Sequence, residues 1–458
     1  MEELHPTFFL ENLGCAKNQV DAEIMISRLE DRGWRLTDQA GDAQYILINT
    51  CGFIQPAKEE SIEVTMEYLR DYPESKVILT GCLAQRYPED LSQDIPEVEG
   101  VFGNHSVQRI AEFLEDRLPR GQRVFIPGAS YGPNPELPAP EFDSRHRTRL
   151  LSYPGSAYLK ISEGCRNRCS FCAIPLIRGS LRSRTIQDVT QEARGLLSRG
   201  IKELNLIAQD LSDFGRDRGP AGRGEFPALV KSLLELPGDF WIRLLYIYPE
   251  HFPLEILEIC NQDPRVLPYF DIPMQHASSK ILKAMGRPGT KESNLELIQR
   301  IRERLPQAVI RTSIITGFPG EDQDDLGELM DFQDRARIEW LGVFAYSREE
   351  GTRAAAMGNQ IPPEEALRRK HLLEDRQIPI MHSRIDRFIG SPSSMIIEDL
   401  VPQRDGQAAA ALGRTPFQAP DVDGLTVLPA PPGHLKPGMV VPVTIKKRNG
   451  VDLIAQAL

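Results

Sequence analysis

The sequence predicts an α/β protein built from three parts: an open parallel α/β sheet at the N-terminus, a partial (β/α)6 barrel, and a small C-terminal β-barrel. The first observation is that short apolar segments alternate with helical patterns in two successive series, a rhythm typical of parallel sheets. The second is that short β segments with an Asn449-Gly450 hairpin signal replace this rhythm from about residue 391.

The N-terminal series predicts strands at Phe8–Leu10, Tyr45–Ile48 and Lys76–Leu79, with helices at Val20–Arg32 and Lys58–Leu69. Each strand is followed by a cysteine beside a glycine, at Cys15, Cys51 and Cys82. Loops after the carboxyl ends of parallel strands converge on one edge, so we expect the three thiols to lie together. We interpret them as three ligands of an iron-sulfur cluster with one open iron. The neighbouring glycines would allow the backbone to approach this bulky cluster closely.

The second series predicts six strands of a partial barrel, with a helix that starts at Thr185 and stops at Gly200. Pro362-Pro363 opens a further helical stretch that we expect Pro379 to break. The six expected strands are Tyr158–Ile161, Glu203–Ala208, Trp241–Ile247, Tyr269–Pro273, Val309–Thr316 and Leu341–Tyr346.

Composition shifts predict domain boundaries. We expect a cluster domain at 1–126, a linker at 127–154, the barrel at 155–388 and the β domain at 389–458. The basic residues Arg145–Arg149 are expected to form a solvated face of the linker.

Bulk composition indicates a soluble globular protein of 458 residues, with 41% hydrophobic and 26% charged residues. No apolar run approaches the ~20 residues of a membrane span, and the N-terminus lacks the features of a signal peptide. Seven cysteines, an odd number, argue against a disulfide framework and favour a cytoplasmic location. The net charge of −11 disfavours long-range attraction to nucleic acid.

The segment from Cys165 through Cys169 to Cys172 carries three thiols in a C-x3-C-x2-C spacing. Three thiolates on one tight loop can hold three irons of a 4Fe-4S cluster and leave the fourth iron open. Zinc sites more often show paired C-x2-C knuckles with four ligands, so the spacing favours iron-sulfur over zinc. It resembles the signature of radical S-adenosylmethionine (SAM) enzymes, and this resemblance implies that the open iron binds SAM.

Further motifs make the chain similar to the methylthiotransferase family over nearly its whole length. The matching stretches are Asn12–Asn18, Arg178-Gly179 through Arg182-Ser183-Arg184, Gly317–Glu321, and Tyr346-Ser347 with Glu350-Gly351-Thr352. The resemblance implies an N-terminal cluster domain, a radical SAM barrel and a TRAM domain. It also implies two 4Fe-4S clusters, SAM, and sulfide as the sulfur source.

Three stretches indicate the branch within this family. Gly-Cys-Ala-Lys-Asn at residues 14–18, Ile161–Cys165 and Asp271–His276 resemble the branch that modifies small-subunit ribosomal protein twelve. Its members add a methylthio group to the β-carbon of an aspartate. The alternatives are a transfer-RNA adenosine methylthiotransferase with the same cofactors and a non-catalytic zinc or nucleic-acid-binding protein. Residues 391–458 carry equal numbers of basic and acidic side chains, which argues against dominant RNA binding.

The resemblance also implies a division of labour between the two three-cysteine sets. The cluster on Cys165, Cys169 and Cys172 would reduce SAM to methionine and a 5′-deoxyadenosyl radical. The other cluster would carry the sulfur that becomes the methylthio group. The expected partners are ribosomal protein twelve, free or in the assembling small subunit, and a one-electron reductant such as flavodoxin. No membrane partner is expected.

Six other residues are predicted to bind the cofactor: Phe171, Arg182, Arg184, Gln209, Gly317 and Glu321. The resemblance implies that Phe171 packs near the adenine. The two arginines could bind a carboxylate, of SAM or of the target aspartate, in a bidentate manner. The alternatives are exposed charge or a domain contact for the arginines, and a purely geometric turn at Gly317. Gln209 and its neighbour Asp210 could contact cofactor or substrate, or cap the next helix.

Two further residues, His276 and Cys260, have possible structural roles. His276 follows an expected barrel strand and could carry a proton, or it could have a hydrogen-bonded structural role. Cys260 ends an apolar helical run, where a free cysteine usually packs as a small hydrophobe.

Overall fold

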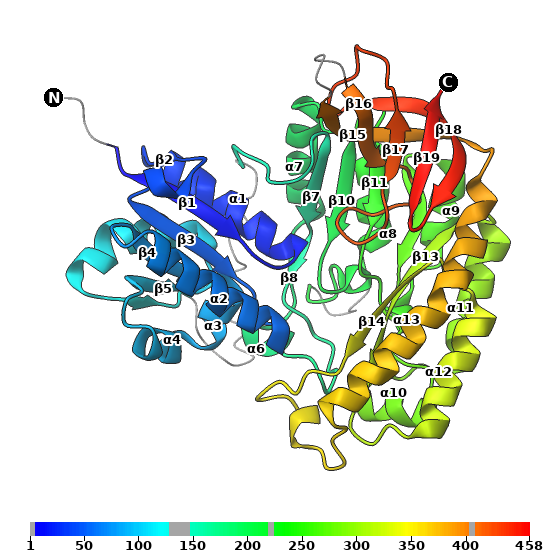
Figure 1. Cartoon of the computed structure of the whole chain (residues 1–458), viewed down its shortest axis with the longest axis horizontal. Coiled ribbons are helices and arrows are strands. Elements are labelled where there is room, and N and C mark those ends of the chain that lie inside the picture. The colour runs from blue at the N-terminus through cyan, green and yellow to red at the C-terminus, as the bar shows by residue number, and fades with distance from the viewer. Residues whose placement is uncertain (1–4, 128–146, 219–223, 403–407) are drawn as a thin grey trace. The chain divides into compact units, whose positions relative to one another are not determined.

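The computed structural model of the protein describes residues 5–127, 147–218, 224–402 and 408–458 (Figure 1). It contains two compact units, and we describe each by itself. The first consists of Met1–Leu151, Ser162–Arg184 and Ser347–Ala355, and the second of Ser152–Ile161, Thr185–Tyr346 and Ala356–Leu458. All six cysteines of the two predicted sets therefore belong to the first unit.

The first unit contains a six-stranded parallel sheet in the order β2-β1-β3-β4-β5-β6. Its strands are β1 (Thr7–Asn12), β2 (Arg35–Leu36), β3 (Tyr45–Thr50), β4 (Lys76–Thr80), β5 (Gly100–Phe102) and β6 (Val124–Phe125). The structure confirms the three predicted strands. The other three have only two or three residues each, too few for an apolar pattern to reveal them.

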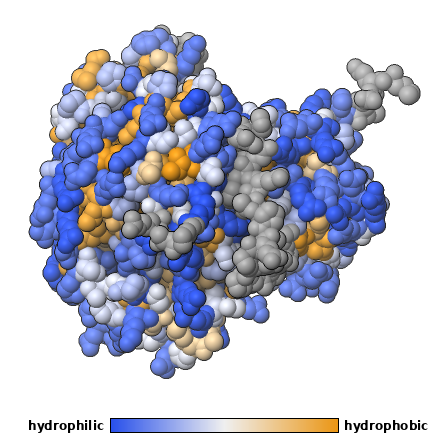
Figure 2. Space-filling view, turned by 180° about the vertical axis from the view of Figure 1, so that it is seen from behind, coloured by the Kyte–Doolittle hydropathy of each residue, from blue (hydrophilic) through white to orange (hydrophobic). Residues whose placement is uncertain are grey.

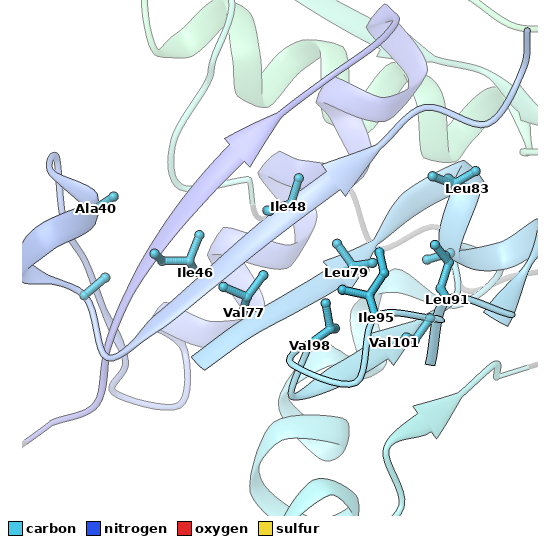
Figure 3. Close-up of a cluster of buried hydrophobic side chains, with 12 residues drawn as sticks. Ala40, Ile46, Ile48, Val77, Leu79, Leu83, Leu91, Ile95, Val98 and Val101 are labelled. Carbon is cyan, nitrogen blue, oxygen red and sulfur yellow. The ribbon is translucent and has the colours of Figure 1, made fainter. Parts of the chain in front are cut away.

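Alternating side chains of the central strands fill the core on both faces of this sheet. Ile46 and Ile48 of β3 belong to one buried cluster with Val77 of β4, while Leu47 between them is also fully buried (Figure 3). Successive strand residues point to opposite faces, so a run that is apolar at every position requires cover on both sides.

Helices connect the strands of the first unit. The longer ones are α1 (Ala16–Glu30), α2 (Gln55–Asp71), α3 (Gly81–Arg86), α4 (Pro88–Asp94) and α6 (Ile174–Arg178). The structure confirms α1 and α2, each a few residues longer than predicted. A short antiparallel pair, β8 (Ser162–Glu163) with β9 (Arg182–Ser183), closes the segment that contains the second cysteine set.

The expected linker contains a buried ion pair, which corrects the prediction of a solvated basic face. Arg147 is 2% exposed and donates to the fully buried carboxylate of Glu23 in α1. Arg149 pairs with Glu30, seven residues after Glu23 in the same helix, at 2.8 Å. Arg145 lies outside the described residues. Acidic side chains of α1 bind this part of the linker. The paired residues are more than 100 positions apart in the sequence.

The second unit contains the predicted six-stranded parallel sheet, in the order β14-β13-β12-β11-β10-β7. Its strands are β7 (Ser156–Lys160), β10 (Glu203–Ile207), β11 (Trp241–Leu244), β12 (Val266–Asp271), β13 (Val309–Thr316) and β14 (Trp340–Ala345). Each one overlaps its predicted range, although β10 and β13 also contain polar residues.

Seven helices are described in the second unit: α7 (Ile186–Ser198), α8 (Phe226–Leu234), α9 (Glu255–Gln262), α10 (Ser279–Met285), α11 (Lys291–Arg304), α12 (Gln323–Ala336) and α13 (Pro363–Ile385). The predicted cap of α7 is confirmed, since the Thr185 hydroxyl accepts from the Asp188 amide at 3.1 Å. The predicted break at Pro379 is wrong, because α13 continues through this residue.

The C-terminal strands close into a barrel in the order β15-β16-β17-β19-β18, as predicted for this segment. They are β15 (Pro392–Pro402), β16 (Ala408–Arg414), β17 (Thr426–Pro429), β18 (Val440–Asn449) and β19 (Asp452–Ala457). The Asn449-Gly450 signal does mark a hairpin, since Asn449 pairs with Asp452 and Gly450 has a φ of +65°.

The loop between β16 and β17 attaches this barrel to the parallel sheet within the second unit. Tyr158 of β7 donates to Asp421 at 2.9 Å, and Tyr269 of β12 donates to Asp423 at 2.6 Å. The indole of Trp340 donates to the Phe417 carbonyl at 3.0 Å. The small barrel is thus joined to the sheet by side-chain hydrogen bonds as well as by the chain itself.

Hydrophilic residues cover most of the face shown in Figure 2, with smaller groups of hydrophobic residues among them. Among the helices that the structure describes, none combines the length and the apolar character that crossing a membrane requires.

Candidate active site

The first cysteine set lies at the carboxyl edge of the N-terminal sheet. Cys15 immediately precedes α1 after β1, Cys51 follows β3, and Cys82 lies in the first turn of α3 after β4. These strands are neighbours in the order β1-β3-β4, so their carboxyl ends open onto one edge. Cys15 is exposed, Cys51 half-buried and Cys82 buried. The predicted placement of the three thiols at this edge is confirmed.

The three loops touch one another through their glycines. A β-carbon at Gly14 would lie 3.3 Å from the Cys51 sulfur, and one at Gly52 would lie 2.7 Å from the Leu83 α-carbon. A β-carbon at Gly81 would lie 2.5 Å from the Thr50 carbonyl oxygen. The glycines at 52 and 81 therefore allow neighbouring loops to pack closely, which differs from the predicted role of admitting an inorganic group.

Cys82 has a dense polar environment. Its sulfur receives hydrogen bonds from Arg178 Nη2 at 3.3 Å and Asn104 Nδ2 at 3.4 Å. It donates to Asn18 Oδ1 at 3.2 Å. Ala173 and Ile177, which follow the second cysteine set, pack against the same side chain. Cys82 is thus held between α1 and the segment that contains the other three thiols.

Asn18 connects the loops beneath this set. Its amide donates to the carbonyls of Leu13 at 3.1 Å and Thr50 at 2.9 Å, which lie in the loop after β1 and at the end of β3. Its oxygen accepts from Arg178 at 2.7 Å. Asn18 and Asp21 lie three residues apart and so on the same face of α1, where both are buried. This face of α1 presents polar groups to the cysteines.

Burial raises the pKa of the Cys51 thiol, and it raises the pKa of the Cys82 thiol to about 12. The Arg178 guanidinium acts in the opposite direction on the pKa of both thiols. A thiol must lose its proton before it binds a metal. Arg178 therefore favours the form of these cysteines that can act as a ligand.

The second cysteine set lies on the loop between β8 and α6, where Cys165, Cys169 and Cys172 are each half-buried. The Cys165 amide donates to the Gly179 carbonyl at 3.1 Å, so the two ends of the loop are tied together. Gly164 has a φ of +73°, and a β-carbon there would lie 2.1 Å from the Ser180 carbonyl oxygen. Only glycine fits this position, which starts the cysteine loop.

Residues 347–355 support the cysteine loop from outside. The Ala354 amide donates to the Ser170 carbonyl at 2.8 Å, and Arg353 donates to the Arg168 carbonyl. In the same segment, Glu349 is buried and accepts from Arg86 of α3 at 2.5 Å and from Lys58 of α2 at 3.0 Å. Burial opposes ionisation of Glu349, but hydrogen bonds from Ser347, Arg86 and Lys58 together hold its pKa below the usual range. This segment joins the cysteine loop to the N-terminal sheet.

Phe171, Arg182 and Arg184, the predicted cofactor residues of the first unit, differ in how deeply they are buried. Phe171 is half-buried directly before Cys172. Arg182 is half-buried and donates to the Arg178 carbonyl at 3.3 Å, while burial lowers its pKa. Arg184 is 3% exposed, which rules out the alternative of an exposed charge for this residue.

Gln209 lies in the second unit, directly after β10, and is half-buried. Its neighbour Asp210 is buried and caps the short helical turn at Leu211–Asp213, accepting from the Ser212 amide at 2.9 Å. Asp210 therefore has the capping role that the sequence offered as the alternative to a cofactor contact.

Glu321 organises the turn that begins at Gly317. One carboxylate oxygen accepts from the Gly317 amide at 2.8 Å and from the Phe318 amide at 3.3 Å, and the other accepts from Arg369 of α13 at 2.7 Å. Glu321 is 2% exposed. A β-carbon at Gly317 would lie 2.2 Å from the Ala366 β-carbon. These contacts favour the alternative of a turn held by its own geometry.

His276 and Cys260 are both buried in the second unit. The His276 Nδ1 accepts from the Ser278 amide at 3.0 Å, and its Nε2 lies 3.5 Å from the Glu321 carboxylate, as in the hydrogen-bonded alternative. Cys260 packs in α9, as predicted, and burial raises its pKa to about 12.

Within the described ranges, no three histidine, cysteine or acidic side chains converge on a single metal-ion position. The ligands of an iron-sulfur cluster do not converge on one position, because each thiolate binds a different iron.

Sequence reasoning missed Arg178, Asn18 and Asn104 as functional candidates. Arg178 and Asn18 lie inside stretches that were noted only as family motifs. Arg178 ends the apolar helix α6, and an arginine buried at 2% needs partners nearby. That pattern signals a buried charge, but which residues neutralise it depends on the tertiary fold.

Three family descriptions match successive parts of the chain. Residues 7–103 match the uncharacterized protein family UPF0004, residues 159–332 the radical SAM superfamily, and residues 389–458 the TRAM domain.

Several curated relatives match nearly end to end, and each carries the name ribosomal protein uS12 methylthiotransferase RimO. The protein of Treponema denticola is 39% identical, covering 97% of this chain and 99% of the relative. That of Syntrophomonas wolfei is 42% identical, covering 91% and 92%. That of a Thermotoga species is 40% identical, covering 96% and 97%.

Among solved structures, the radical SAM methyltransferase TsrM from Kitasatospora setae has a TM-score of 0.55 at 15% identity. It covers 75% of this chain and 72% of its own, which shows a shared fold. The curated relatives, which match nearly the whole chain, identify its family. The chain belongs to the family of ribosomal protein uS12 methylthiotransferases.

Proposed function

We propose that the protein is a radical SAM enzyme that adds a methylthio group to the β-carbon of an aspartate in ribosomal protein uS12. The observation that carries this proposal is the presence of two three-cysteine sets in one compact unit. Each set offers three thiols, and the remaining cysteine, Cys260, is buried in the other unit. Bound at these sets, one 4Fe-4S cluster would pass an electron from the reductant to SAM, and the other would carry the sulfide that becomes the sulfur of the methylthio group.

Cys165, Cys169 and Cys172 are assigned to the SAM-binding cluster. All three lie on one loop whose ends are tied by the Cys165–Gly179 hydrogen bond, so the backbone presets their spacing. Each sulfur is half-buried and thus reachable by a cofactor. Phe171 lies beside the last ligand as a candidate surface for the adenine. Arg182 and Arg184 are candidates for a carboxylate of SAM or of the target aspartate.

Cys15, Cys51 and Cys82 are assigned to the sulfur-carrying cluster. Their exposure increases from Cys82 through Cys51 to Cys15, so the set is closed on the α3 side and open at Cys15. An open side is needed for sulfide to enter and for the modified aspartate to leave. In the second unit, Gln209, Gly317 and Glu321 remain proposed cofactor contacts, and for Glu321 this role would have to coexist with its turn contacts.

The charge distribution supports a basic protein substrate over RNA. The chain carries a net charge of −11. In the C-terminal barrel, Arg414 is buried against Glu203 and Glu398, and Arg448 pairs with Asp386. These two arginines are thus occupied within the protein and do not face a phosphate backbone. The acceptor is accordingly proposed to be uS12, free or in the assembling small subunit.

We also propose that the protein acts in the cytoplasm with a one-electron reductant such as flavodoxin. Six thiols must stay reduced to bind iron, and a reducing compartment keeps them so.

An anaerobic assay tests the proposal. Protein reconstituted with iron and sulfide is given SAM, dithionite and, side by side, a peptide of the uS12 target loop and an adenosine-modified anticodon stem. Mass spectrometry should find one added methylthio group on the peptide aspartate. Modification of the RNA alone would contradict the proposed acceptor and assign the enzyme to transfer RNA.

Cysteine variants test the cluster assignment in the same assay. Cys169→Ala should form no 5′-deoxyadenosine and should bind about half of the wild-type iron. Cys260→Ala is the matched control, since it removes a buried thiol outside both sets and should retain iron and deoxyadenosine formation. Full deoxyadenosine formation by Cys169→Ala would refute the assignment of the SAM-binding cluster.

A further inference from the structure

Arg178 is a buried arginine that contacts one cysteine set while belonging to the segment of the other. It is the last residue of α6, the helix that follows Cys172, and it is 2% exposed. Its Nη2 atom donates to the Cys82 sulfur at 3.3 Å and to Asn18 Oδ1 at 2.7 Å. Arg178 lies six positions after Cys172, the last cysteine of the second set, and donates a hydrogen bond to Cys82 of the first set.

The other side of the guanidinium faces two carboxylates. Nη1 lies 3.0 Å from Asp21 of α1 and 2.9 Å from Glu163 of β8. Both carboxylates are buried. A planar guanidinium can serve four acceptors in fixed directions, whereas a lysine ammonium offers a single charged point. The arrangement therefore requires arginine and places one positive and two negative charges close to Cys82.

From these contacts we infer that Arg178 is a positioning residue that raises the reduction potential of the cluster on Cys15, Cys51 and Cys82. The inference rests on the proposed function, because it takes Cys82 as a cluster ligand. One-electron reduction adds a negative charge to a cluster. A cation and hydrogen bonds at a ligand sulfur stabilise that added charge, so they raise the potential.

The neighbouring charges give the inference a sign test. Replacing Arg178 removes a positive charge and leaves Asp21 and Glu163 without their cation, so both changes lower the potential. Replacing Asp21 by asparagine removes a negative charge and raises it. A residue that served only to hold the fold would not move the potential in opposite directions with the sign of the charge removed.

The experiment isolates the cluster in the full-length chain by replacing Cys165, Cys169 and Cys172 with alanine. This variant is reconstituted anaerobically, its iron content is measured, and the cluster is titrated with dithionite while electron paramagnetic resonance records the reduced form. The same titration is made after adding Arg178→Gln, Arg178→Lys or Asp21→Asn. Arg109→Gln is the matched control, because Arg109 pairs with Glu112 on a partly exposed face of the same unit.

The expected result is a more negative potential for Arg178→Gln, a more positive one for Asp21→Asn, and a value for Arg178→Lys between wild type and Arg178→Gln. Arg109→Gln should leave the potential unchanged. An unchanged potential in a fully loaded Arg178→Gln variant would overturn the inference. If Arg178→Gln binds no cluster, the double variant with Asp21→Asn relieves one unpaired carboxylate; failure of that variant to load would assign Arg178 to folding alone.

A failure of the proposed function gives a different result. If the triple-alanine protein binds no iron, or if it keeps its iron after Cys82→Ala is added, then these cysteines do not hold a cluster. That outcome is read from the iron content before any potential is measured.

Discussion

Glu203 and Arg414 form a fully buried ion pair between the first residue of β10 and the last residue of β16. The two Nη atoms of Arg414 lie 3.1 and 2.5 Å from the two carboxylate oxygens of Glu203. Arg243 of β11 donates to the same carboxylate at 2.9 Å. Glu203 is thus shared by two arginines where the C-terminal barrel meets the parallel sheet, and Glu398 pairs with Arg414 as a second carboxylate. The pKa of Glu203 lies well below the usual range because both cations outweigh burial.

Glu203→Gln should strongly destabilise the second unit. The change leaves two guanidiniums buried without their shared counter-charge, and breaking a buried pair in this way costs about 3–5 kcal/mol. Denaturant unfolding checks it by tryptophan fluorescence in a Trp34→Phe background, so that Trp241 and Trp340 report. Glu296→Gln is the control, because its pair with Arg300 is exposed and contributes about 0.3–0.5 kcal/mol. Equal unfolding midpoints for the two variants would contradict the prediction.

Asp423 should make the stability of the second unit depend on pH. Burial raises its pKa from 3.8 to about 6, although the Ala419 amide, the Tyr269 hydroxyl and Arg311 each oppose the shift. The folded state therefore binds more protons than the unfolded state between these two values, and its free energy of unfolding falls as pH rises through this window. The loss approaches about 3 kcal/mol for a shift of this size.

The measurement for Asp423 is the free energy of unfolding from pH 4 to pH 7 in wild type and Asp423→Asn. Asparagine does not titrate, so the difference between the two proteins should change across the window in the stated direction. A difference that is constant with pH would show that Asp423 titrates alike in both states.

Gly317→Ala should destabilise the turn after β13 far more than Gly320→Ala. Both glycines have positive φ values, +74° and +82°, so alanine strains the backbone at either position by about 1–2 kcal/mol. At Gly317 the new methyl group would also overlap Ala366 of α13, which adds about 1–3 kcal/mol, whereas Gly320 has open space. Thermal unfolding of both variants gives the comparison. A Gly320→Ala variant as unstable as Gly317→Ala would rule out the packing explanation.

Arg147→Ala should destabilise the first unit, because it leaves the Glu23 carboxylate buried without a cation. The expected loss is about 3–5 kcal/mol. Trp34 reports on this unit in a background where Trp241 and Trp340 are phenylalanine. Arg149→Ala is the control, since Arg149 is half exposed and pairs with Glu30 at the surface. Unfolding of Arg147→Ala at the wild-type denaturant concentration would restore the original prediction of a solvated linker.

Local patterns were sufficient to predict the longer strands of the two parallel sheets and the edge on which the first cysteine set lies. The strands at Tyr45–Thr50 and Lys76–Thr80 are continuous apolar runs, and such runs are readable because burial on both faces acts at every position. The placement of Cys15, Cys51 and Cys82 followed from topology alone, since parallel strands deliver their following loops to one edge. Family motifs then indicated the chemistry.

Contacts between distant charged residues could not be predicted in the same way. The predicted solvated patch at Arg145–Arg149 was wrong for Arg147, whose partner Glu23 precedes it by 124 positions. The expected break at Pro379 was also wrong, because tertiary packing of α13 tolerates the lost hydrogen bond. Arg178 went unnoticed for the reason that its partners come from β8, α1 and α3.

The sequence by itself determined the longer strands and helices of the two parallel sheets, the two cysteine sets and the family, because these depend on local periodicity and on spacing within short motifs. Only the tertiary structure decided which buried charges neutralise one another. Glu203 and Arg414 are separated by 211 positions, and Arg178 and Cys82 by 96. Whether a charged side chain is solvated or buried depends on the surfaces that fold around it, which no local pattern in the chain records.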